Sequence, residues 1–426
     1  MKIIRFGELY SIPTSNGVSR PSAVRGEGFH MINMGELFSF DVINEMPMER
    51  VFLSDKEQKK YLVKKGDLLF ARQSLVAAGA GKCSIVNNIL EPTTFESHLI
   101  RVRLDETRCC PRYYYYLFKL PDNPIKTIVN QCAQAGIRGS ELQKIKVPLP
   151  MLAEQRRIAS ILSAYDNLIE NNNRRIRLLE QMAENLYKEW FVRFRFPGHE
   201  KAEFVASKLG KIPSSFSVTN MGDVFEEYIG GGWGNDEVSE EFPISASVIR
   251  GADFPSVWHY DVSTCPKRFH KKSNYKSRQL HDGDIVMEIS GGTSEQPVGR
   301  TVLVTQDLID RFEGGRVICA SFCKMINLNK EKISPYFFYF WMHYLYNTRI
   351  IDRFQLQSTG IINFKFESFL KKGIVMLPSK DVMLSFDKHI IPLFKEINQL
   401  AIQNDKLSRQ RDLLLPRLMS GKLEVK

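Results

Sequence analysis

The sequence predicts an α+β protein made of two pseudo-repeated globular domains and two long antiparallel coiled-coil helices. Three observations support this fold class: the chain is 426 residues long, short motifs occur twice in one order, and each series leads into a long helical segment. A domain usually has ~150 residues, so a chain of this length should form two or three compact parts. The hydrophobic share of 43% and the charged share of 25% are globular values that can supply more than one core.

The internal duplication rests on four landmarks that keep their order in each half. In the first half they are residues 65–69 (KGDLL), 110–116 (CPRYYYY), 135–137 (AGI) and 147–150 (VPLP). In the second half they are residues 282–286 (DGDIV), 334–339 (SPYFFY), 359–361 (TGI) and 375–378 (VMLP). Four landmarks in the same order are hard to produce by chance and indicate a repeat.

Each half begins with short β-like runs among glycine-bearing turns, which is typical of a mixed α+β domain. The runs are residues 61–70 and 99–104 in the first half, and 284–289 and 300–305 in the second. The segment after Glu154 differs, because it has neither glycine nor proline until Pro197 and Gly198 stop it after Phe196. It is predicted to be one long helix, and the second copy is predicted to end near Leu415.

Two columns of residues at heptad spacing run along each long segment, and such a double column is typical of a coiled-coil seam. The predicted seam residues are Ile158, Leu162, Ile169, Asn172 and Ile176 in the first segment, and Ile390, Leu393, Ile397, Leu400, Asn404 and Leu407 in the second. Asn172 and Asn404 take equivalent places when Ile158 is aligned with Ile390. An asparagine in a seam can fix the register at some cost in stability, and the alternative is that each asparagine faces solvent.

Pairing the two helices within the chain would satisfy both seams. An antiparallel pair would put the globular domains at opposite ends. Helices of roughly 32 to 36 residues are about 50 Å long, so we expect the pair to act as a ruler between the domains.

The chain is basic, with 59 Lys and Arg, 48 Asp and Glu, and a formal net charge of +11. This excess favours an anionic partner, although charge alone does not separate DNA from RNA or a membrane. No apolar run reaches the ~20 residues of a membrane helix, and the first residues do not resemble a secretory signal, so a cytoplasmic protein is expected. The seven cysteines form no CxxC pair and are interpreted as reduced thiols, and Cys319, Cys323 and His343 do not fit a zinc site.

No complete catalytic or cofactor motif is present. Residues 79–83 (GAGKC) resemble a phosphate loop, but Val76 occupies the place of the first glycine and Cys83 that of the metal-binding Ser or Thr. The glycines of residues 230–234 lack GxGxxG spacing. Hydrolase and amino-methyltransferase signatures are also missing. We therefore expect no catalytic residue, no metal site and no cofactor in this chain.

Arginine, lysine, aromatic and amide side chains beside glycine-bearing turns are the candidates for DNA contacts. Arginine and the amides can reach base edges, and lysines suit phosphates, whereas the alternative for each residue is a solvated loop. The first-half candidates are Arg20, Arg25, Arg72, Gln73, Gln134 and Arg138. The second-half candidates are Trp233, Asn235, Lys267, Arg268, Lys271, Lys272, Ser358 and Asn363.

The regions around the long helices resemble a known family. Residues 147–150, followed by residues 154–162 (EQRRIASIL) and Asp166, are similar to the central conserved region of the specificity subunits of type I restriction-modification systems. Residues 407–423 (LSRQRDLLLPRLMSGKL) are similar to the distal conserved region of the same family. Together with the repeat, the resemblance covers nearly the whole chain.

The resemblance implies two target-recognition domains, residues 1–150 and 199–378, each reading one half of a bipartite, asymmetric DNA site. The central conserved helix would be residues 151–198, and the distal conserved helix with the C-terminal tail would be residues 379–426. The implied partners are double-stranded DNA, two modification subunits that use S-adenosylmethionine, and restriction subunits that use ATP and Mg²⁺. Catalysis would then reside in those partners, and this chain would not be an enzyme.

One departure from the repeat concerns the expected docking surfaces for the modification subunits. The second copy has Lys380, Asp381, Phe386 and Asp387 where the first has the Glu-Gln pair of residues 154–155. This difference predicts docking surfaces of unequal strength.

Three other functions remain open on the sequence alone. A methyltransferase or nuclease with its own active site would need a cofactor or metal constellation. A coiled-coil scaffold that binds DNA without sequence preference would need a uniform basic surface and no enzyme partner. A specificity subunit could also serve a solitary methylation system or a fused relative of it.

Overall fold

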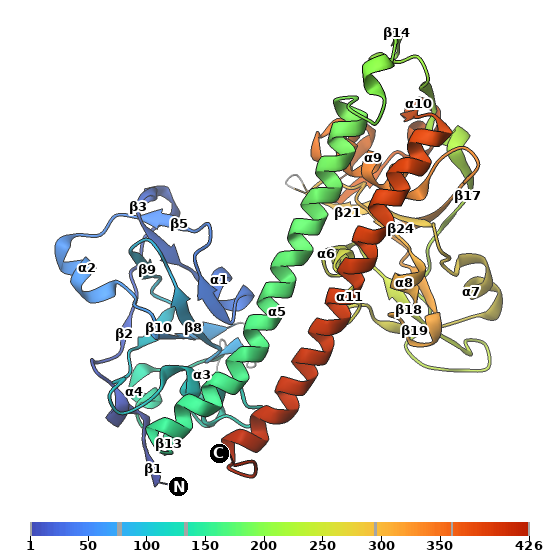
Figure 1. Ribbon diagram of the computed structural model, residues 1–426. Helices are drawn as coiled ribbons and strands as arrows, with labels where there is room; N and C mark the ends of the chain where they lie inside the picture. Colours follow the sequence, from blue (N-terminus) through green and yellow to red (C-terminus); the bar gives the residue numbers. More distant parts are fainter. Residues whose placement is uncertain (1, 75–78, 132–134, 294–295, 359–360, 425–426) are drawn as a thin grey trace. The chain divides into compact units, whose positions relative to one another are not determined.

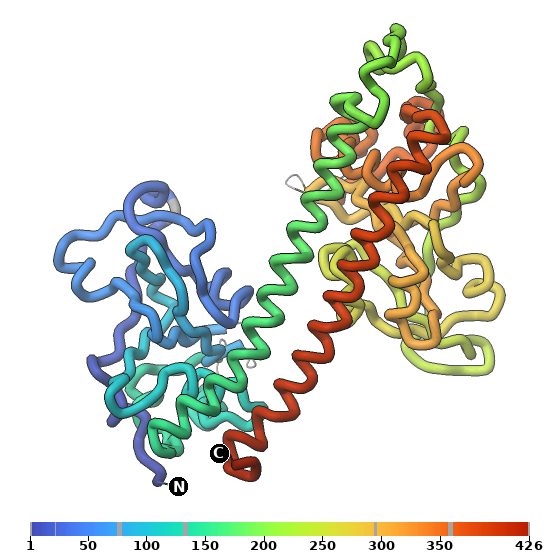
Figure 2. The backbone as a smooth tube through the Cα atoms, viewed as in Figure 1, coloured from blue at the N-terminus to red at the C-terminus, as the bar shows by residue number. Residues whose placement is uncertain are grey.

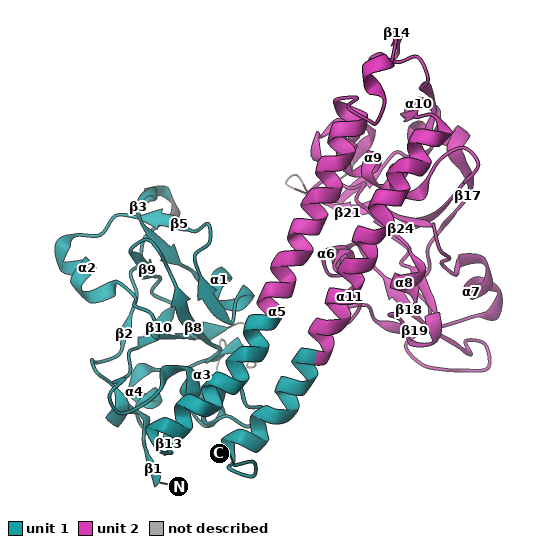
Figure 3. Ribbon diagram, in the orientation of Figure 1, with its two compact units in different colours: residues 1–168, 407–426 teal, residues 169–406 magenta. Residues whose placement is uncertain are grey.

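The computed structural model describes residues 2–74, 79–131, 135–293, 296–358 and 361–424, and it divides into two compact units (Figure 3). Unit 1 comprises residues 1–168 and 407–426, and unit 2 comprises residues 169–406. Each unit contains a globular part and a segment of each of two long helices, α5 (Leu152–Tyr187) and α11 (Lys380–Met419). Figures 1 and 2 show both as continuous helices. No helix in the described ranges combines the length and the apolar character needed to span a membrane.

The globular part of unit 1 is built of small sheets and short helices. A five-stranded sheet has the order β2 (Ser15–Asn16), β10 (Leu99–Val102), β6 (Leu68–Ala71), β8 (Cys83–Asn88), β4 (Val42–Asn44). Two three-stranded sheets have the orders β5 (Glu49–Val51), β3 (Arg25–Ile32), β9 (Thr93–Phe95), and β11 (Asn130–Gln131), β12 (Ala135–Gly136), β7 (Gln73–Ser74). The remaining elements are the antiparallel pair β1 (Lys2–Arg5) and β13 (Lys146–Leu149), with helices α1 (Met34–Ser39), α2 (Asp55–Tyr61), α3 (Pro111–Lys119) and α4 (Gly139–Leu142).

The globular part of unit 2 has the same kinds of elements. Its four-stranded sheet has the order β17 (Phe225–Gly230), β24 (Cys323–Leu328), β20 (Ile285–Glu288), β22 (Thr301–Leu303). Its three-stranded sheets have the orders β19 (Lys267–His270), β18 (Ile244–Ile249), β23 (Val317–Cys319), and β21 (Ser290–Gly292), β26 (Ile361–Phe364), β25 (Gln355–Ser358). The other strands form the pairs β14 (Phe204–Ser207) with β15 (Gly210–Pro213), and β16 (Ser217–Asn220) with β27 (Ile374–Leu377). The helices are α6 (Phe254–Trp258), α7 (Lys272–Arg278), α8 (Gln306–Ile309), α9 (Pro335–Asn347) and α10 (Phe366–Lys372).

The two units repeat each other strand by strand. The core order β10-β6-β8 of unit 1 corresponds to β24-β20-β22 of unit 2. Strand β3 lies between antiparallel β5 and parallel β9, and β18 lies between antiparallel β19 and parallel β23. Unit 1 adds β4, and unit 2 adds the hairpin β14-β15. The predicted α+β class and the internal duplication are therefore confirmed.

The first landmark of the repeat is a turn that leads into the central strand of each sheet. Gly66 and Gly283 both have a φ of +89°, a conformation that glycine adopts without strain. The following residues, Asp67 and Asp284, are each 1% exposed, and each accepts a hydrogen bond from the backbone N–H three residues earlier, at 2.8 Å and 2.7 Å. The motif recurs because both units need the same buried turn before β6 and β20.

In unit 1 the beginning of α5 packs against the end of α11. Leu162 is fully buried in one cluster with Leu415 and Leu418. Arg411 donates a hydrogen bond to Asp166 across the two helices at 2.7 Å. Residues early in one helix thus contact residues late in the other, as an antiparallel pair requires.

In unit 2 the pairing continues in the same sense. Asn172, which is 5% exposed, donates a hydrogen bond from Nδ2 to Oδ1 of Asn404 at 3.0 Å. Further along α5, Arg175 pairs with Glu396 at 2.7 Å. The contact between the two asparagines favours the seam interpretation over solvent exposure, and the predicted antiparallel helix pair is confirmed.

The predicted seam residues differ in burial. Those that are buried are Ile158, Leu162, Asn172, Ile176, Ile390, Ile397 and Leu400. Those that are partly exposed are Ile169, Leu393, Asn404 and Leu407. The partly exposed residues lie at the edge of the helix contact.

The helix ends depart from the sequence prediction. Helix α11 continues past Pro416 to Met419, because Leu418 and Met419 are buried in the core of unit 1 and their packing offsets the hydrogen bond that the proline lacks. Helix α5 gives way at Lys188 to a π-helical turn, Lys188–Val192, whose Trp190 and Phe191 are buried in unit 2.

Candidate nucleic-acid interface

In unit 1, a small three-stranded sheet collects predicted DNA-binding residues from distant parts of the sequence. Arg72 directly precedes β7 and Gln73 begins it, and both are half-buried. The carbonyl oxygen of Arg72 accepts a hydrogen bond from the backbone N–H of Ile137 at 2.9 Å, which brings the exposed Arg138 to the same sheet. Gln134 lies outside the described residues.

Unit 2 has an equivalent sheet with different side chains. Ser290 of β21 donates a hydrogen bond to Oδ1 of Asn363 on β26 at 2.6 Å, and the two residues are paired in register. Ser358 ends β25, and its side chain lies outside the described residues. In this sheet Ser290 therefore takes the place of Gln73 of unit 1, and Asn363 takes the place of Gly136.

Backbone hydrogen bonds show which residues of the two small sheets occupy equivalent positions. Arg72 donates its N–H to the residue just before β10 and accepts from the residue just after β12. Ile289 makes the same two kinds of hydrogen bond. Its N–H donates to Phe322, just before β24, and its carbonyl accepts from Phe364, the last residue of β26. One backbone position thus carries a cation in unit 1 and an apolar side chain in unit 2.

A second group of predicted residues surrounds β19 in unit 2. The backbone of Asn235 exchanges two hydrogen bonds with Phe269, at 2.8 and 2.9 Å. The guanidinium of Arg268 lies 4.7 Å from the ring centre of Trp233 and forms an ion pair with Asp236. The loop and the strand together hold the Arg268 side chain, whose exposed fraction is 12%.

In unit 2 the loop that carries Trp233 begins where the backbone of Gly231 passes close to another strand, and unit 1 has the same close approach at Gly17. A Cβ atom on Gly17 would lie 1.9 Å from a backbone carbonyl oxygen at the end of β9, and one on Gly231 would lie 2.2 Å from the carbonyl that follows β23. Only glycine allows the chain to pass at this distance. Two residues later unit 1 has Ser19 and unit 2 has Trp233, so the two loops again share a path and differ in chemistry.

The predicted lysines lie on the surface of unit 2. Lys267 pairs with Glu313, and Lys271 pairs with Glu241. Lys272 is exposed at the first residue of α7. Exposed ion pairs contribute only about 0–1 kcal/mol, so a phosphate could replace either carboxylate at little cost.

Two predicted arginines of unit 1 are engaged inside the protein. Arg20 pairs with Glu57 at 2.6 Å, and Arg25 pairs with Glu49 at 2.5 Å. Their side chains are 27% and 22% exposed. Arg20 fastens its loop to α2, and Arg25 joins the first residues of β3 and β5, so a DNA contact by either would require its ion pair to be exchanged.

The Glu-Gln motif near the start of α5 has an internal role that sequence reasoning missed. Gln155 is fully buried, accepts a hydrogen bond from the N–H of Cys110 at 2.9 Å, and donates one to the carbonyl of Pro150 at 2.9 Å. In unit 2, Asp387 accepts a hydrogen bond from the hydroxyl of Ser334 at 2.7 Å. Both side chains fasten a long helix to the first turn of an aromatic helix, α3 or α9. Aligning the repeats at Ile158 and Ile390 would have paired these two positions.

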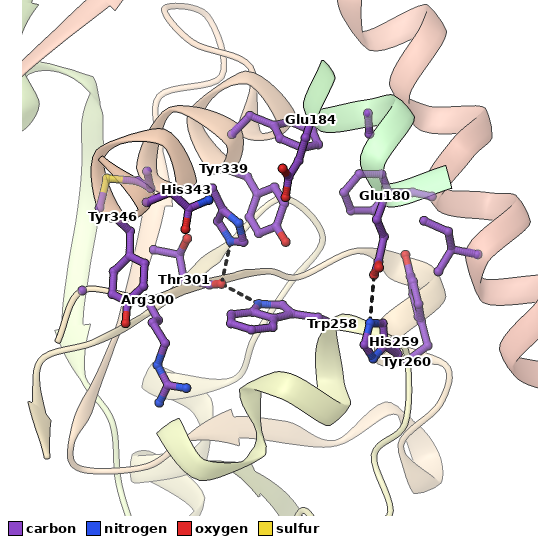
Figure 4. A pocket seen from close by; sticks show the side chains of 17 residues that line it. Glu180, Glu184, Trp258, His259, Tyr260, Arg300, Thr301, Tyr339, His343 and Tyr346 are labelled. Atoms are coloured by element: carbon purple, nitrogen blue, oxygen red, sulfur yellow. Dashed lines mark hydrogen bonds and ion pairs between the residues drawn. The ribbon is translucent and has the colours of Figure 1, made fainter. Parts of the chain in front are cut away.

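A cavity of about 350 Å³ lies within unit 2, between its segments of the long helices and its globular part (Figure 4). Trp258 donates a hydrogen bond to the carbonyl oxygen of Thr301 at 2.8 Å, and burial lowers the pKa of His343 to about 4, so that this histidine is neutral at pH 7. Glu180 pairs with His259 at 3.1 Å, and this contact raises the pKa of His259 above its ordinary value. None of the predicted DNA-binding residues lines the cavity in the described ranges. The cavity is instead lined by residues of α5 and of the globular part of unit 2, which the Glu180–His259 ion pair connects.

Comparisons with known proteins agree with this architecture. A family model described as the type I restriction modification DNA specificity domain matches residues 32–181. The MjaIX specificity subunit of Methanocaldococcus jannaschii is 26% identical over 320 residues, covering 74% of this chain and 69% of that protein. The HindI specificity subunit of Haemophilus influenzae is 22% identical over 419 residues, covering 86% of this chain and 88% of that protein.

A solved structure shows the same fold. The crystal structure of the type I restriction-modification S subunit from M. genitalium matches with a TM-score of 0.56 and 15% identity, covering 98% of this chain and 95% of that one.

These findings support a place for the chain, first, in the type I restriction-modification class. Within that class the chain is similar to the specificity subunits, which are non-catalytic components of these systems. The expectation that this chain is not an enzyme is thereby confirmed.

Proposed function

We propose that this chain reads a bipartite, asymmetric DNA site, one half with the globular part of each unit, and docks modification subunits and, through them, restriction subunits. The observation that carries the proposal is the matching backbone of the two small sheets, which carries Arg72 and Gln73 in unit 1 and Ile289, packed against the core, and Ser290 in unit 2. Two copies of one fold can approach DNA with the same geometry, while different side chains read different bases. The two half-sites therefore differ in sequence.

The arginine and glutamine candidates would contact bases, and the lysines would contact phosphates. Arg72 and Gln73 can each form a bidentate pair with a base edge in the major groove, which gives specificity. The lysines around β19, all three of which are exposed, would contact phosphates and give affinity that falls with salt. The net charge of +11 supports this second role.

The modification subunits would dock on the outer face of α5. Leu168, Leu178 and Met182 are 50%, 50% and 56% exposed, which is unusual for large apolar side chains on a helix that already packs along its other face. S-adenosylmethionine, ATP and Mg²⁺ would be bound by the partner subunits, and the complex would act in the cytoplasm.

Single-molecule methylome sequencing tests the proposal. Cells that express this chain with its neighbouring modification subunit are compared with cells that lack this chain and with cells that carry Arg72→Ala. We expect a split adenine-methylated motif that depends on the chain, and a relaxed base preference in one half of it for the variant. An assembled complex that produces no motif would contradict the proposal and favour a scaffold that binds DNA without sequence preference.

A further inference from the structure

A histidine and two glutamates of unit 1 lie together at a place that the proposed function does not use. His30 is in β3, Glu45 follows β4, and Glu91 precedes β9. One donor atom from each residue lies within 4.8 Å of the others. Because β3 and β9 are parallel neighbours with His30 opposite Thr93, the fold itself brings Glu91 to the histidine.

His30 is the group that indicates a ligand. It is 7% exposed, and its Nδ1 atom is buried without a hydrogen-bond partner. That atom lies 3.4 Å from Oε1 of Glu45, and Nε2 lies 3.9 Å from Oε2 of Glu91. Buried polar atoms in proteins nearly always have a partner, so a histidine nitrogen facing carboxylates without a hydrogen bond is a candidate metal ligand.

The spacing suits a metal ion of zinc size. Zinc binds histidine nitrogen at about 2.0–2.1 Å and carboxylate oxygen at about 2.0–2.2 Å, so neighbouring ligands of a tetrahedral site lie about 3.4 Å apart. The separation between His30 and Glu45 has this value. Glu91 lies nearest Nε2, the other ring nitrogen, so its half-exposed side chain would have to turn toward Nδ1 to bind the same ion.

Neighbouring groups already orient both carboxylates. The N–H of Leu90 donates to Oε2 of Glu45 at 2.7 Å, and Arg50 donates to Oε2 of Glu91 at 2.7 Å. Hydrogen bonds of this kind hold metal-binding carboxylates in place. They leave Oε1 of Glu45 for the ion, whereas Oε2 of Glu91 accepts from Arg50 and is also the oxygen that lies 3.9 Å from Nε2 of His30.

We propose that His30, Glu45 and Glu91 form a site for a divalent transition metal, with Zn²⁺ as the ion that fits the donor set best. One imidazole and two carboxylates without a thiolate suit Zn²⁺ or Mn²⁺, and the fourth position would hold water. The ion would tie together β3 and the segments that carry the two glutamates. The rival arrangement is a protonated His30 held between the two carboxylates with no metal.

Metal analysis of the purified full-length chain tests the site. The chain is stripped with EDTA, dialysed against Zn²⁺ and then against buffer, and its zinc content is measured by mass spectrometry while its melting temperature is recorded. We expect one tightly held Zn²⁺ per chain and a rise in melting temperature of several degrees.

Variants separate a specific site from surface binding. Glu91→Gln, chosen because this side chain is half-exposed and its loss should leave the fold intact, should lower zinc affinity at least tenfold. His98→Ala is the matched control, since His98 is an exposed histidine of unit 1 that lies 3.6 Å from Glu96, and it should keep the metal. Absence of stoichiometric zinc in the unaltered chain, or equal affinity in Glu91→Gln, would overturn the proposal.

Discussion

Replacing Gln155 with alanine should destabilise unit 1 without altering the outer surface of α5. The fully buried side chain makes hydrogen bonds to the N–H of Cys110 and the carbonyl of Pro150, both at 2.9 Å. Each buried backbone group left without a partner costs about 1–3 kcal/mol, and the lost methylene packing adds to this. We expect the free energy of unfolding to fall by about 2–5 kcal/mol.

Thermal unfolding measured by calorimetry gives the result directly. For a unit of this size, 1 kcal/mol shifts the melting temperature by about 2–4 °C, so Gln155→Ala should lower it by roughly 4–20 °C. Arg156→Ala is the control, because Arg156 is the exposed neighbour on the same helix and its removal should change stability by less than about 0.5 kcal/mol.

The same variant distinguishes an internal anchor from a docking residue. If Gln155→Ala melts like the unaltered chain but no longer captures the modification subunit, then the glutamine acts in docking and its anchoring role is wrong. If stability falls and the complex still assembles well below the melting temperature, the anchor is supported.

Three further changes test other parts of the structure. Asp387→Asn should stabilise unit 2 by about 1–2 kcal/mol at pH 8 and leave its stability unchanged at pH 4. Burial raises the pKa of Asp387 to about 6, so the unaltered unit loses stability as the pH rises from 4 through 6 and the carboxylate ionises. Asparagine stays neutral and avoids this loss. Urea unfolding at both pH values checks this, and an equal gain at pH 4 would argue against it. Arg72→Ala should weaken binding of one half-site by about 1–3 kcal/mol in competition assays, whereas an equal loss on random DNA would mark a phosphate contact. Replacing Leu162 and Ile176 together with serine should separate the helix pair and abolish assembly with the modification subunit in size-exclusion chromatography, and unchanged assembly would count against the seam.

Much of the fold could be predicted because its signals lie close together in the sequence. The heptad columns around Ile158 and Ile390 predict two long helices, since side-chain spacing along a helix is a local property. The duplication is visible because Gly66 and Gly283 begin the same turn in both halves. Aligning the two copies puts Asn172 and Asn404 at equivalent places, but only the structure shows that they contact each other.

The candidate interface was predicted less completely. Residue types at glycine-bearing turns marked Arg72, Gln73 and Arg138 as candidates for DNA contacts, and only the structure brings them to one sheet. The sequence did not reveal that Arg20 and Arg25 are held by Glu57 and Glu49, because those carboxylates lie in other elements.

By itself the sequence determined the α+β class, the repeat and the paired helices, because periodicity and repetition are properties of neighbouring residues. Only the tertiary structure decided that Gln155 turns inward, that Arg268 is held beside Trp233, and that His30 meets two glutamates. Each of these contacts joins residues from separate elements. The physical reason is that burial and hydrogen bonding depend on distance in space, which is set only when the strands and helices pack.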